Sequence, residues 1–271
     1  MADIRVGIAG CAGRMGRTLV AEVHAMAGLR LAGGSEALDS PMLGRDVGEL
    51  AGIGATGLAV TADLGVLFRD ADVVIDFTSP VASVAHAEQA AKSGKALVIG
   101  TTGLDAAQTK AIATAARRVP IVWASNMSPA VTMLLALVEE AARRLGDDYD
   151  IEVLEMHHRH KVDAPSGTAL ALGRAAAAGR GIDVAARSQR VRDGHTGARP
   201  RGDIGFATLR GGDVVGDHVV IFAGEGERLE LAHRATSRRI FALGALRAAR
   251  WVVAQKPGLY GMKDVLGLSK D

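Results

Sequence analysis

The chain has 271 residues, of which 48% are hydrophobic and 23% are charged, and its formal net charge is only +2. This length and composition predict one large or two ordinary domains with a sizeable core. Aromatic residues make up 3% of the chain, which does not favour binding of single-stranded nucleic acid by stacking. The single cysteine, Cys11, excludes a disulfide framework and a cysteine-based zinc cluster within the chain.

The first residues and the length of the apolar runs bear on targeting and on membrane insertion. The first residues carry an early acid, Asp3, and lead directly into a strand pattern, unlike a signal peptide. The longest apolar run, 131–138, is far shorter than the ~18 residues that a membrane span needs. We therefore expect a soluble, cytoplasmic protein without membrane contacts.

In the first half of the chain, short and wholly apolar segments alternate with helical patterns. The expected strands are 4–10, 29–35, 73–77, 96–100 and 121–124, and the expected helices are 14–27, 81–92 and 105–117. Strands that are apolar throughout are buried on both faces. The alternation therefore predicts a parallel sheet covered by helices on both sides.

The pattern changes after about residue 128. We expect helices at 131–145, 168–178 and 238–255, alternating strands at 150–156, 204–209, 218–223 and 228–233, and a polar, arginine-rich loop at 187–201. Alternation of polar and apolar residues predicts an antiparallel sheet with one exposed face. Two architectures in one chain predict two domains, and no internal repeat is visible.

A glycine-rich turn separates the first expected strand from the first expected helix. It contains Gly10, Gly13 and Gly16, a spacing that departs from the common Gly-x-Gly-x-x-Gly fingerprint. Without Cβ atoms the backbone can approach a pyrophosphate, and the helix N-terminus supplies free N–H groups. Glu36 ends the second strand about 20 residues later, where an acid binds a ribose diol. A tight turn without a ligand is the alternative, but the combination favours a dinucleotide.

Polar turns follow three further strands of the first half. They are 76–80, 100–103 and 124–127. Each could be an ordinary turn. Because ligands gather at the carboxyl ends of parallel strands, we expect the three together to line the nicotinamide side of a cleft.

The richest segment is 155–168, Glu-Met-His-His-Arg-His-Lys-Val-Asp-Ala-Pro-Ser-Gly-Thr. Ser166 is a plausible N-cap, so the amides of Gly167 and Thr168 would form an anion site. With His158 and Lys161, that site would receive a small carboxylate, and a neighbouring histidine could supply a proton at neutral pH.

Other interpretations of the basic segments are open. His157, His158 and His160 could bind a metal, although adjacent strand residues point to opposite faces and no His-Glu-x-x-His spacing is present. The segment could also be a solvated charged run. The arginines of 187–201 could contact nucleic acid, but no aromatic residues or known motif accompany them. We expect neither a metal nor a nucleic-acid partner.

These motifs resemble the dihydrodipicolinate reductase (4-hydroxy-tetrahydrodipicolinate reductase) family. The resemblance rests on Gly-Cys-Ala-Gly-Arg-Met-Gly at 10–16, Gly-Thr-Thr-Gly at 100–103 and the segment 155–169, and it extends to Gly-Leu-Tyr at 258–260. It implies an α/β fold with a Rossmann-type parallel-sheet cofactor domain, 1–128 and 239–271. An α+β domain with a mixed or antiparallel sheet, 129–238, would bind substrate and form the oligomer. The final helix returns to the cofactor domain, and domain closure is expected.

The resemblance also implies an activity and its residues. The enzyme would be a cytoplasmic homotetramer that uses NADH or NADPH to reduce dehydrated 4-hydroxy-tetrahydrodipicolinate on the diaminopimelate route to lysine. His157 would donate the proton and Lys161 would be a second acid or electrostatic partner, while His158, Gly167 and Thr168 would bind the substrate carboxylate. The cofactor contacts would be Gly10, Cys11, Ala12, Gly13, Arg14, Met15, Glu36, Gly100, Thr101, Thr102, Ala124, Ser125, Asn126 and Met127.

Two departures from the family pattern matter. Ala37 stands where the family often has an arginine that would meet a 2′-phosphate, which favours NADH. Pro129 stands in a stretch that joins the domains, where we expect it to stiffen the hinge.

Two other functions are weighed against this one. An amino-acid semialdehyde dehydrogenase would need a catalytic cysteine, and Cys11 lies in the phosphate turn. A dinucleotide-sensing protein without chemistry would need a DNA-binding helix pair, which the sequence does not offer.

Overall fold

The computed structural model describes residues 2–269, which divide into two compact units. Residues up to Ser128, together with those from Arg239 onwards, form unit 1, and Pro129–Arg238 form unit 2. None of the helices within residues 2–269 is both long and apolar enough to span a membrane.

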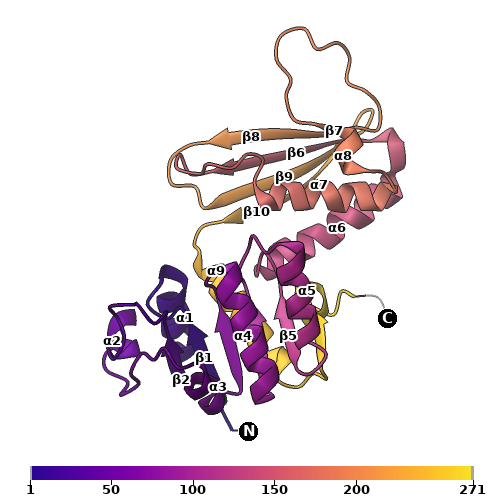
Figure 1. Ribbon diagram of the computed structural model, residues 1–271. Helices are drawn as coiled ribbons and strands as arrows, with labels where there is room; N and C mark the ends of the chain where they lie inside the picture. The colour runs from indigo at the N-terminus through magenta and orange to yellow at the C-terminus, as the bar shows by residue number, and fades with distance from the viewer. Residues whose placement is uncertain (1, 270–271) are drawn as a thin grey trace. The chain divides into compact units, whose positions relative to one another are not determined.

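Unit 1 is built on a six-stranded sheet in the order β11-β5-β4-β3-β1-β2 (Figure 1). Its strands are β1 (Ile4–Ala9), β2 (Leu29–Ser35), β3 (Val73–Asp76), β4 (Ala96–Ile99), β5 (Pro120–Trp123) and β11 (Gly258–Tyr260). All neighbouring strands run parallel. After β1 the chain adds β2 on one side and then β3, β4 and β5 on the other. The strand order therefore reverses between β1 and β3, and this is where parallel sheets bind ligands.

Helices cover both faces of this sheet. They are α1 (Arg14–Ala25), α2 (Val47–Ala51), α3 (Leu64–Asp70), α4 (Pro80–Ser93), α5 (Ala106–Ala115), α9 (Arg239–Val252) and α10 (Met262–Val265). Leu19 of α1 and Leu246 of α9 pack against Ile8 and Ile75 in one hydrophobic cluster. Phe68 of α3 and Ile112 of α5 belong to a second cluster with Val74 and Leu97. Neighbouring residues of β3 thus contribute to opposite clusters, as a strand buried on both faces requires.

The first residue of α9 is tied to the first helix of the chain. The Arg239 guanidinium donates two hydrogen bonds to the carboxylate of Glu22 in α1. This pair joins residues 217 positions apart in the sequence. Helix α9 therefore belongs to unit 1.

Unit 2 contains a five-stranded sheet in the order β10-β9-β6-β8-β7. Its strands are β6 (Asp150–His157), β7 (Ser188–Gln189), β8 (Ile204–Arg210), β9 (Gly216–Ala223) and β10 (Arg228–Ala235). Its helices are α6 (Pro129–Leu145), α7 (Gly167–Arg180), α8 (Val184–Arg187) and the 3-10 turn η1 (Gly146–Asp148). Pro129 is the first residue of α6, a position at which its missing N–H costs no helical hydrogen bond.

The sheet of unit 2 is mixed. The expected antiparallel pairing is found between β6 and β9 and between β9 and β10. In contrast, β8 runs parallel to β6 and to β7. The physical reason is the intervening helix: α7 carries the chain back between β6 and β8, as a parallel connection requires.

The two faces of this sheet differ. Ile151, Val153, Val220 and Phe222 join residues of α6 and α7 in a hydrophobic cluster, and Figure 1 shows both helices on one side of the sheet. Side chains alternate along a strand. Leu154, Met156, Val219 and Ile221 therefore point to the other side, which we call the open face; all four are partly exposed.

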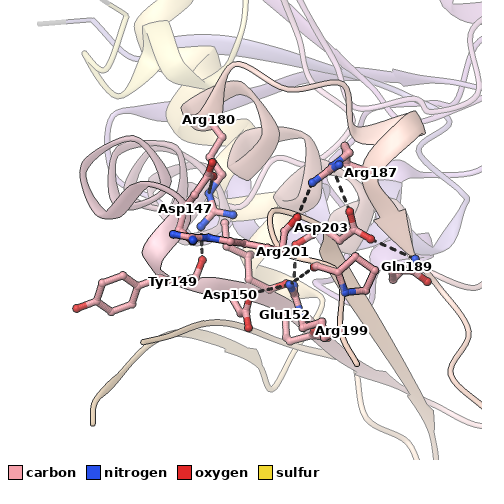
Figure 2. Close-up of polar contacts among 12 residues, drawn as sticks. Asp147, Tyr149, Asp150, Glu152, Arg180, Arg187, Gln189, Arg199, Arg201 and Asp203 are labelled. Atoms are coloured by element: carbon pink, nitrogen blue, oxygen red, sulfur yellow. Dashed lines mark hydrogen bonds and ion pairs between the residues drawn. The ribbon is translucent and has the colours of Figure 1, made fainter. Parts of the chain in front are cut away.

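The arginine-rich loop is tied to the same unit by ion pairs (Figure 2). Arg199 reaches the carboxylates of Asp150 at 2.7 Å and Glu152 at 3.0 Å. Arg187 pairs with Asp203 at 3.1 Å. Arg192 and Arg201 pair with Glu152 and Asp148, each at 2.7 Å. These charges have partners within the unit instead of forming a free basic patch.

Candidate active site

The glycine turn follows β1 at the carboxyl edge of the parallel sheet. Gly10 has φ +72°, a backbone conformation that residues with a side chain rarely adopt. A Cβ at Gly16 would lie 2.0 Å from the Gly10 carbonyl oxygen. Any side chain at this position would therefore push α1 away from the turn. Gly13 is the N-cap of α1 and offers no side-chain acceptor to the first helical amides. The turn thus forms a backbone cradle suited to a pyrophosphate.

Glu36 points back at this turn. Its Oε1 accepts a hydrogen bond of 2.7 Å from the Ala12 amide. Glu36 also lines a pocket of about 310 Å³ together with Ala37 and Leu38. The only basic side chain in the pocket lining is His86, whose Nδ1 lies 3.0 Å from Asp76 Oδ2.

A buried carboxylate joins two of the three polar turns. Asp76 is fully buried, and its Oδ1 accepts hydrogen bonds from the Thr78 amide at 2.9 Å and hydroxyl at 2.6 Å. The Thr101 hydroxyl lies 3.4 Å from the same oxygen. Burial would raise the pKa of Asp76, but His86 together with hydrogen bonds from Ser83 and Thr78 lowers the pKa. Asp76 therefore stays ionised and holds the turns after β3 and β4 together.

The remaining predicted cofactor residues lie at the ends of β4 and β5. A Cβ at Gly100 would lie 2.2 Å from the Phe77 ring, so this position requires glycine. The Ala124 amide donates to the Ile99 carbonyl at 3.1 Å, and Asn126 Oδ1 accepts from the Ser128 amide at 2.8 Å. Met127 lies in the hydrophobic core. Its contacts with a ligand are therefore limited to main-chain atoms.

The same limit applies to Cys11. Its side chain is buried, and a Cβ at Gly34 would lie 2.6 Å from its Sγ. Burial, and then the charge of Glu36, raise the pKa of the thiol to about 12. Cys11 is therefore a protonated, small residue within the turn, which does not suit a nucleophile.

In unit 2, His157 is the last residue of β6 and lies on the helix-covered face of the sheet. Its Nδ1 is 2.5 Å from Oε2 of Glu155, and only 9% of the residue is exposed. Its ring meets the ring of His218 edge-on at 5.1 Å. A Cβ at Gly216 would lie 3.0 Å from His157 Nε2, so the glycine keeps side-chain atoms away from that nitrogen.

The N-terminus of α7 lies next to these residues. Ser166 caps the helix, with its Oγ accepting from the Ala169 amide at 3.1 Å. The same Oγ lies 3.2 Å from His218 Nε2. Gly167 and Thr168 are the first helical residues, and a Cβ at Gly167 would meet no atom within 4 Å. A ligand could therefore approach Gly167 without meeting a side chain, and the N-terminus of a helix favours an anion.

Lys161 and His158 lie in the turn that follows β6. Lys161 donates a hydrogen bond to the His158 carbonyl from its amide, and its Nζ pairs with the exposed Asp163 at 2.7 Å. Burial, and then the charge of Arg238, lower the pKa of His158. The ring of His160 lies 6.3 Å from that of His158. Within residues 2–269 the structure holds no group of three or more His, Cys, Asp or Glu that could bind a metal ion.

Comparison with known proteins finds a matching family model for each unit. The family model described as "Dihydrodipicolinate reductase, N-terminus" matches residues 4–127, and the one described as "Dihydrodipicolinate reductase, C-terminus" matches residues 130–266. The chain belongs to the dihydrodipicolinate reductase family.

Relatives in this family align with the chain almost from end to end. A protein named 4-hydroxy-tetrahydrodipicolinate reductase 1 from Mesorhizobium japonicum is 57% identical over 98% of this chain and 98% of its own length. A 4-hydroxy-tetrahydrodipicolinate reductase from Afipia carboxidovorans is 56% identical over 99% and 98%. The solved dihydrodipicolinate reductase of Paenisporosarcina, with dipicolinate bound, shares the fold with a TM-score of 0.77 at 24% identity, over 97% of this chain and 99% of that one. The resemblance and fold class predicted from sequence are therefore confirmed.

The structure adds residues that the sequence analysis did not assign. Glu155 and Arg210 contact one another beside His157, and His218 contacts both His157 and the Ser166 cap. One signal for Glu155 was available, because it shares its strand face with the core residues Ile151 and Val153. A charged residue at a core-facing position of an alternating strand needs partners, and so points to a site. Arg210 and His218 come from other strands, so their contacts could not be predicted from spacing.

Proposed function

We propose that this member of the family catalyses the NAD(P)H-dependent reduction of dehydrated 4-hydroxy-tetrahydrodipicolinate to tetrahydrodipicolinate, on the diaminopimelate route to lysine. The observation that carries the proposal is the arrangement in unit 2, where a histidine held by a buried carboxylate lies beside the N-terminus of α7. The names of relatives at 56–57% identity support the same reaction. The proposal places the enzyme in the cytoplasm, where nicotinamide coenzymes are available.

Unit 1 carries the residues that fit a dinucleotide. The fit rests on the backbone cradle at 10–16, where a side chain at Gly16 would collide with the turn. The proposed contacts are Gly10 to Met15 for the pyrophosphate, Glu36 for the ribose, and Gly100 to Thr102 with Ala124 to Met127 for the nicotinamide half. When bound, a nicotinamide coenzyme supplies a hydride.

Unit 2 carries the residues that act on the substrate. His158 and the amides of Gly167 and Thr168 would bind one carboxylate, and Lys161 would neutralise charge that develops on the substrate. Asp163, the present partner of Lys161, is 57% exposed in its side chain, so water can replace that contact when a substrate binds. His157 would donate its proton from Nε2 to the carbon next to the reduced position.

We propose NADH as the preferred coenzyme. A 2′-phosphate would add negative charge beside Glu36, and the pocket lining that contains Glu36 and Ala37 has no lysine or arginine to neutralise it. An uncompensated pair of negative charges at short range disfavours binding. NADH lacks that phosphate and leaves both ribose hydroxyls for Glu36.

The proposal is tested by an assay in which the substrate is made from pyruvate and aspartate semialdehyde and oxidation of each coenzyme is followed by absorbance. We expect turnover with both and a higher kcat/KM with NADH. His157→Ala should lower kcat by roughly 10²-fold or more, the scale of a lost general acid, while NADH affinity stays unchanged. Absence of coenzyme oxidation in the wild type would overturn the proposed function, and normal turnover in the variant would remove His157 from its role.

A further inference from the structure

We propose that Glu155 is a positioning residue that holds His157 with its proton-donating nitrogen, Nε2, directed away from Glu155 and towards Gly216, and that fixes the N-terminal end of α7 next to it. The inference rests on the proposed reduction with His157 as proton donor. It assigns no substrate contact to Glu155, which acts only through its neighbours.

Every acceptor site of the Glu155 carboxylate is engaged. Oε2 lies 2.5 Å from His157 Nδ1 and accepts from Arg210 at 2.9 Å. Oε1 accepts from the Ser166 amide at 2.9 Å and from the second Arg210 nitrogen at 3.0 Å. Only 1% of Glu155 is exposed. A buried carboxylate with this set of donors is fixed in one orientation.

The charge state of Glu155 follows from these partners. Burial would raise the pKa of this carboxyl, but hydrogen bonds from Arg210, His157 and the Ser166 amide together lower the pKa. Glu155 is therefore ionised at neutral pH and can only accept hydrogen bonds.

The acceptor beside Nδ1 determines which ring nitrogen of His157 keeps its hydrogen and which one donates it. Because Glu155 offers no hydrogen, Nδ1 of His157 must carry one in both the neutral and the charged ring. The proton that the ring gains and loses is then the one on Nε2. That nitrogen lies beside Gly216, where the missing side chain leaves room. The geometry thus specifies both the tautomer and the direction of proton donation, as in other histidine–carboxylate pairs.

The same carboxylate links the proton donor to the proposed carboxylate site. Glu155 Oε1 accepts from the amide of Ser166, the N-cap residue of α7. Arg210, which grips both oxygens of Glu155, also donates to the Asp163 carbonyl at 2.7 Å. The chain between His157 and Gly167 is therefore held to Glu155 directly at Ser166 and through Arg210 at Asp163. A shift of Glu155 would move the ring and the helix end relative to each other.

Glu155→Gln is the decisive variant, because it keeps the shape but removes the charge. The amide cannot accept from Arg210, Ser166 and His157 at once, since one of its two ends is a donor. We expect kcat to fall about 10²-fold, with unchanged NADH affinity. Adding Glu155→Gln to His157→Ala should lower kcat by less than twofold more, because the effect of Glu155 on proton donation is already lost with His157. Its effect through α7 should instead appear as a higher KM for the substrate.

Nitrogen NMR of labelled histidine gives a readout that does not depend on turnover. In the wild type we expect the His157 ring to carry its neutral-state proton on Nδ1, and in Glu155→Gln we expect that preference to be lost. The His157→Ala spectrum assigns the signal. If the wild type lacks reductase activity, the proposed function fails, and the ring tautomer still tests the positioning claim.

Two further variants guard against a trivial result. Glu155→Asp keeps the charge with a shorter reach, so it should fold, keep the Nδ1 proton and lose less activity than Glu155→Gln. Glu152→Gln is the matched control, since Glu152 lies on the same strand with its own two arginine partners, Arg192 and Arg199, and should keep the wild-type kcat. Wild-type kcat in Glu155→Gln, multiplicative losses in the double variant, or an unchanged tautomer would each overturn the proposal.

Discussion

The buried His218 should make the free energy of unfolding depend on pH in the acid range. Burial, and then the charge of His157, lower its pKa to about 4. Between about pH 6.5 and 4 the unfolded chain binds a proton at this histidine that the folded protein does not. The free energy of unfolding should therefore fall as the pH drops through this window, by up to about 3 kcal/mol from this group, and no further below it.

The measurement is denaturant unfolding at a series of pH values for the wild type and for His218→Asn. The comparison isolates His218, because the carboxylates that titrate in the same window are common to both proteins. We expect a shallower pH dependence in the variant. Parallel curves would show that His218 has the same pKa in the folded and the unfolded chain.

Ala37 bears on coenzyme choice. Ala37→Arg would place a guanidinium next to Glu36 in a pocket whose only other basic side chain is His86. A charged hydrogen bond to a 2′-phosphate is worth roughly 1.5–3 kcal/mol, so the ratio of kcat/KM for NADPH over NADH should rise about 10-fold or more. Ala37→Leu adds bulk without charge and should leave the ratio low. A ratio that rises equally in both variants would mean that size, and not charge, sets the preference.

At the level of elements, α6 and α7 approach each other where the chain has small residues. A Cβ at Gly179 of α7 would lie 2.2 Å from the Glu139 carbonyl oxygen and 2.9 Å from the Cβ of Ala142 in α6. Gly179→Ala should therefore force the helices apart and lower the free energy of unfolding by roughly 1–3 kcal/mol, measured by denaturant titration. Gly167→Ala is the stability control, because a Cβ there has no neighbour within 4 Å. Equal stabilities of the two variants would contradict this packing.

The elements also separate what sequence could predict from what it could not. The long α6 and the apolar β3 and β4 were predicted to within a few residues, because their periodicity matches their burial. The short α2 and β11 were missed. Both are stabilised by tertiary neighbours: Asp46 caps α2 while also binding the Thr56 amide, and β11 pairs with β5 from the far end of the chain.

The parallel pairing of β6 and β8 was missed for a related reason. Alternation of polar and apolar residues shows which face of a strand is buried, but it does not show whether the neighbouring strand runs parallel or antiparallel. The site follows the same rule. His157 and the Ser166 cap lie close in sequence and were singled out. His218 reaches both of them from another strand, and Arg210 reaches Glu155.

At the scale of the whole molecule, the open face of unit 2 bears on assembly. We propose that the protein is a homotetramer and that this face, with Leu154, Met156, Val219 and Ile221, is a subunit interface. Val219 lies between Leu154 of β6 and Ala232 of β10 in the sheet register, so apolar side chains are contiguous across three strands. A contiguous apolar sheet face of this kind is typical of a contact surface.

Val219→Asp tests this surface. A carboxylate at the centre of the open face should prevent its burial against another subunit, since an unpaired buried charge is costly. We expect light scattering coupled to size-exclusion chromatography to show a tetramer for the wild type and a smaller species for the variant, with unit 2 still folded by circular dichroism. Lys110→Asp, on the exposed side of α5 in unit 1, changes charge more strongly but should leave the tetramer intact. A tetramer that persists in Val219→Asp would place the subunit contacts elsewhere on the molecule.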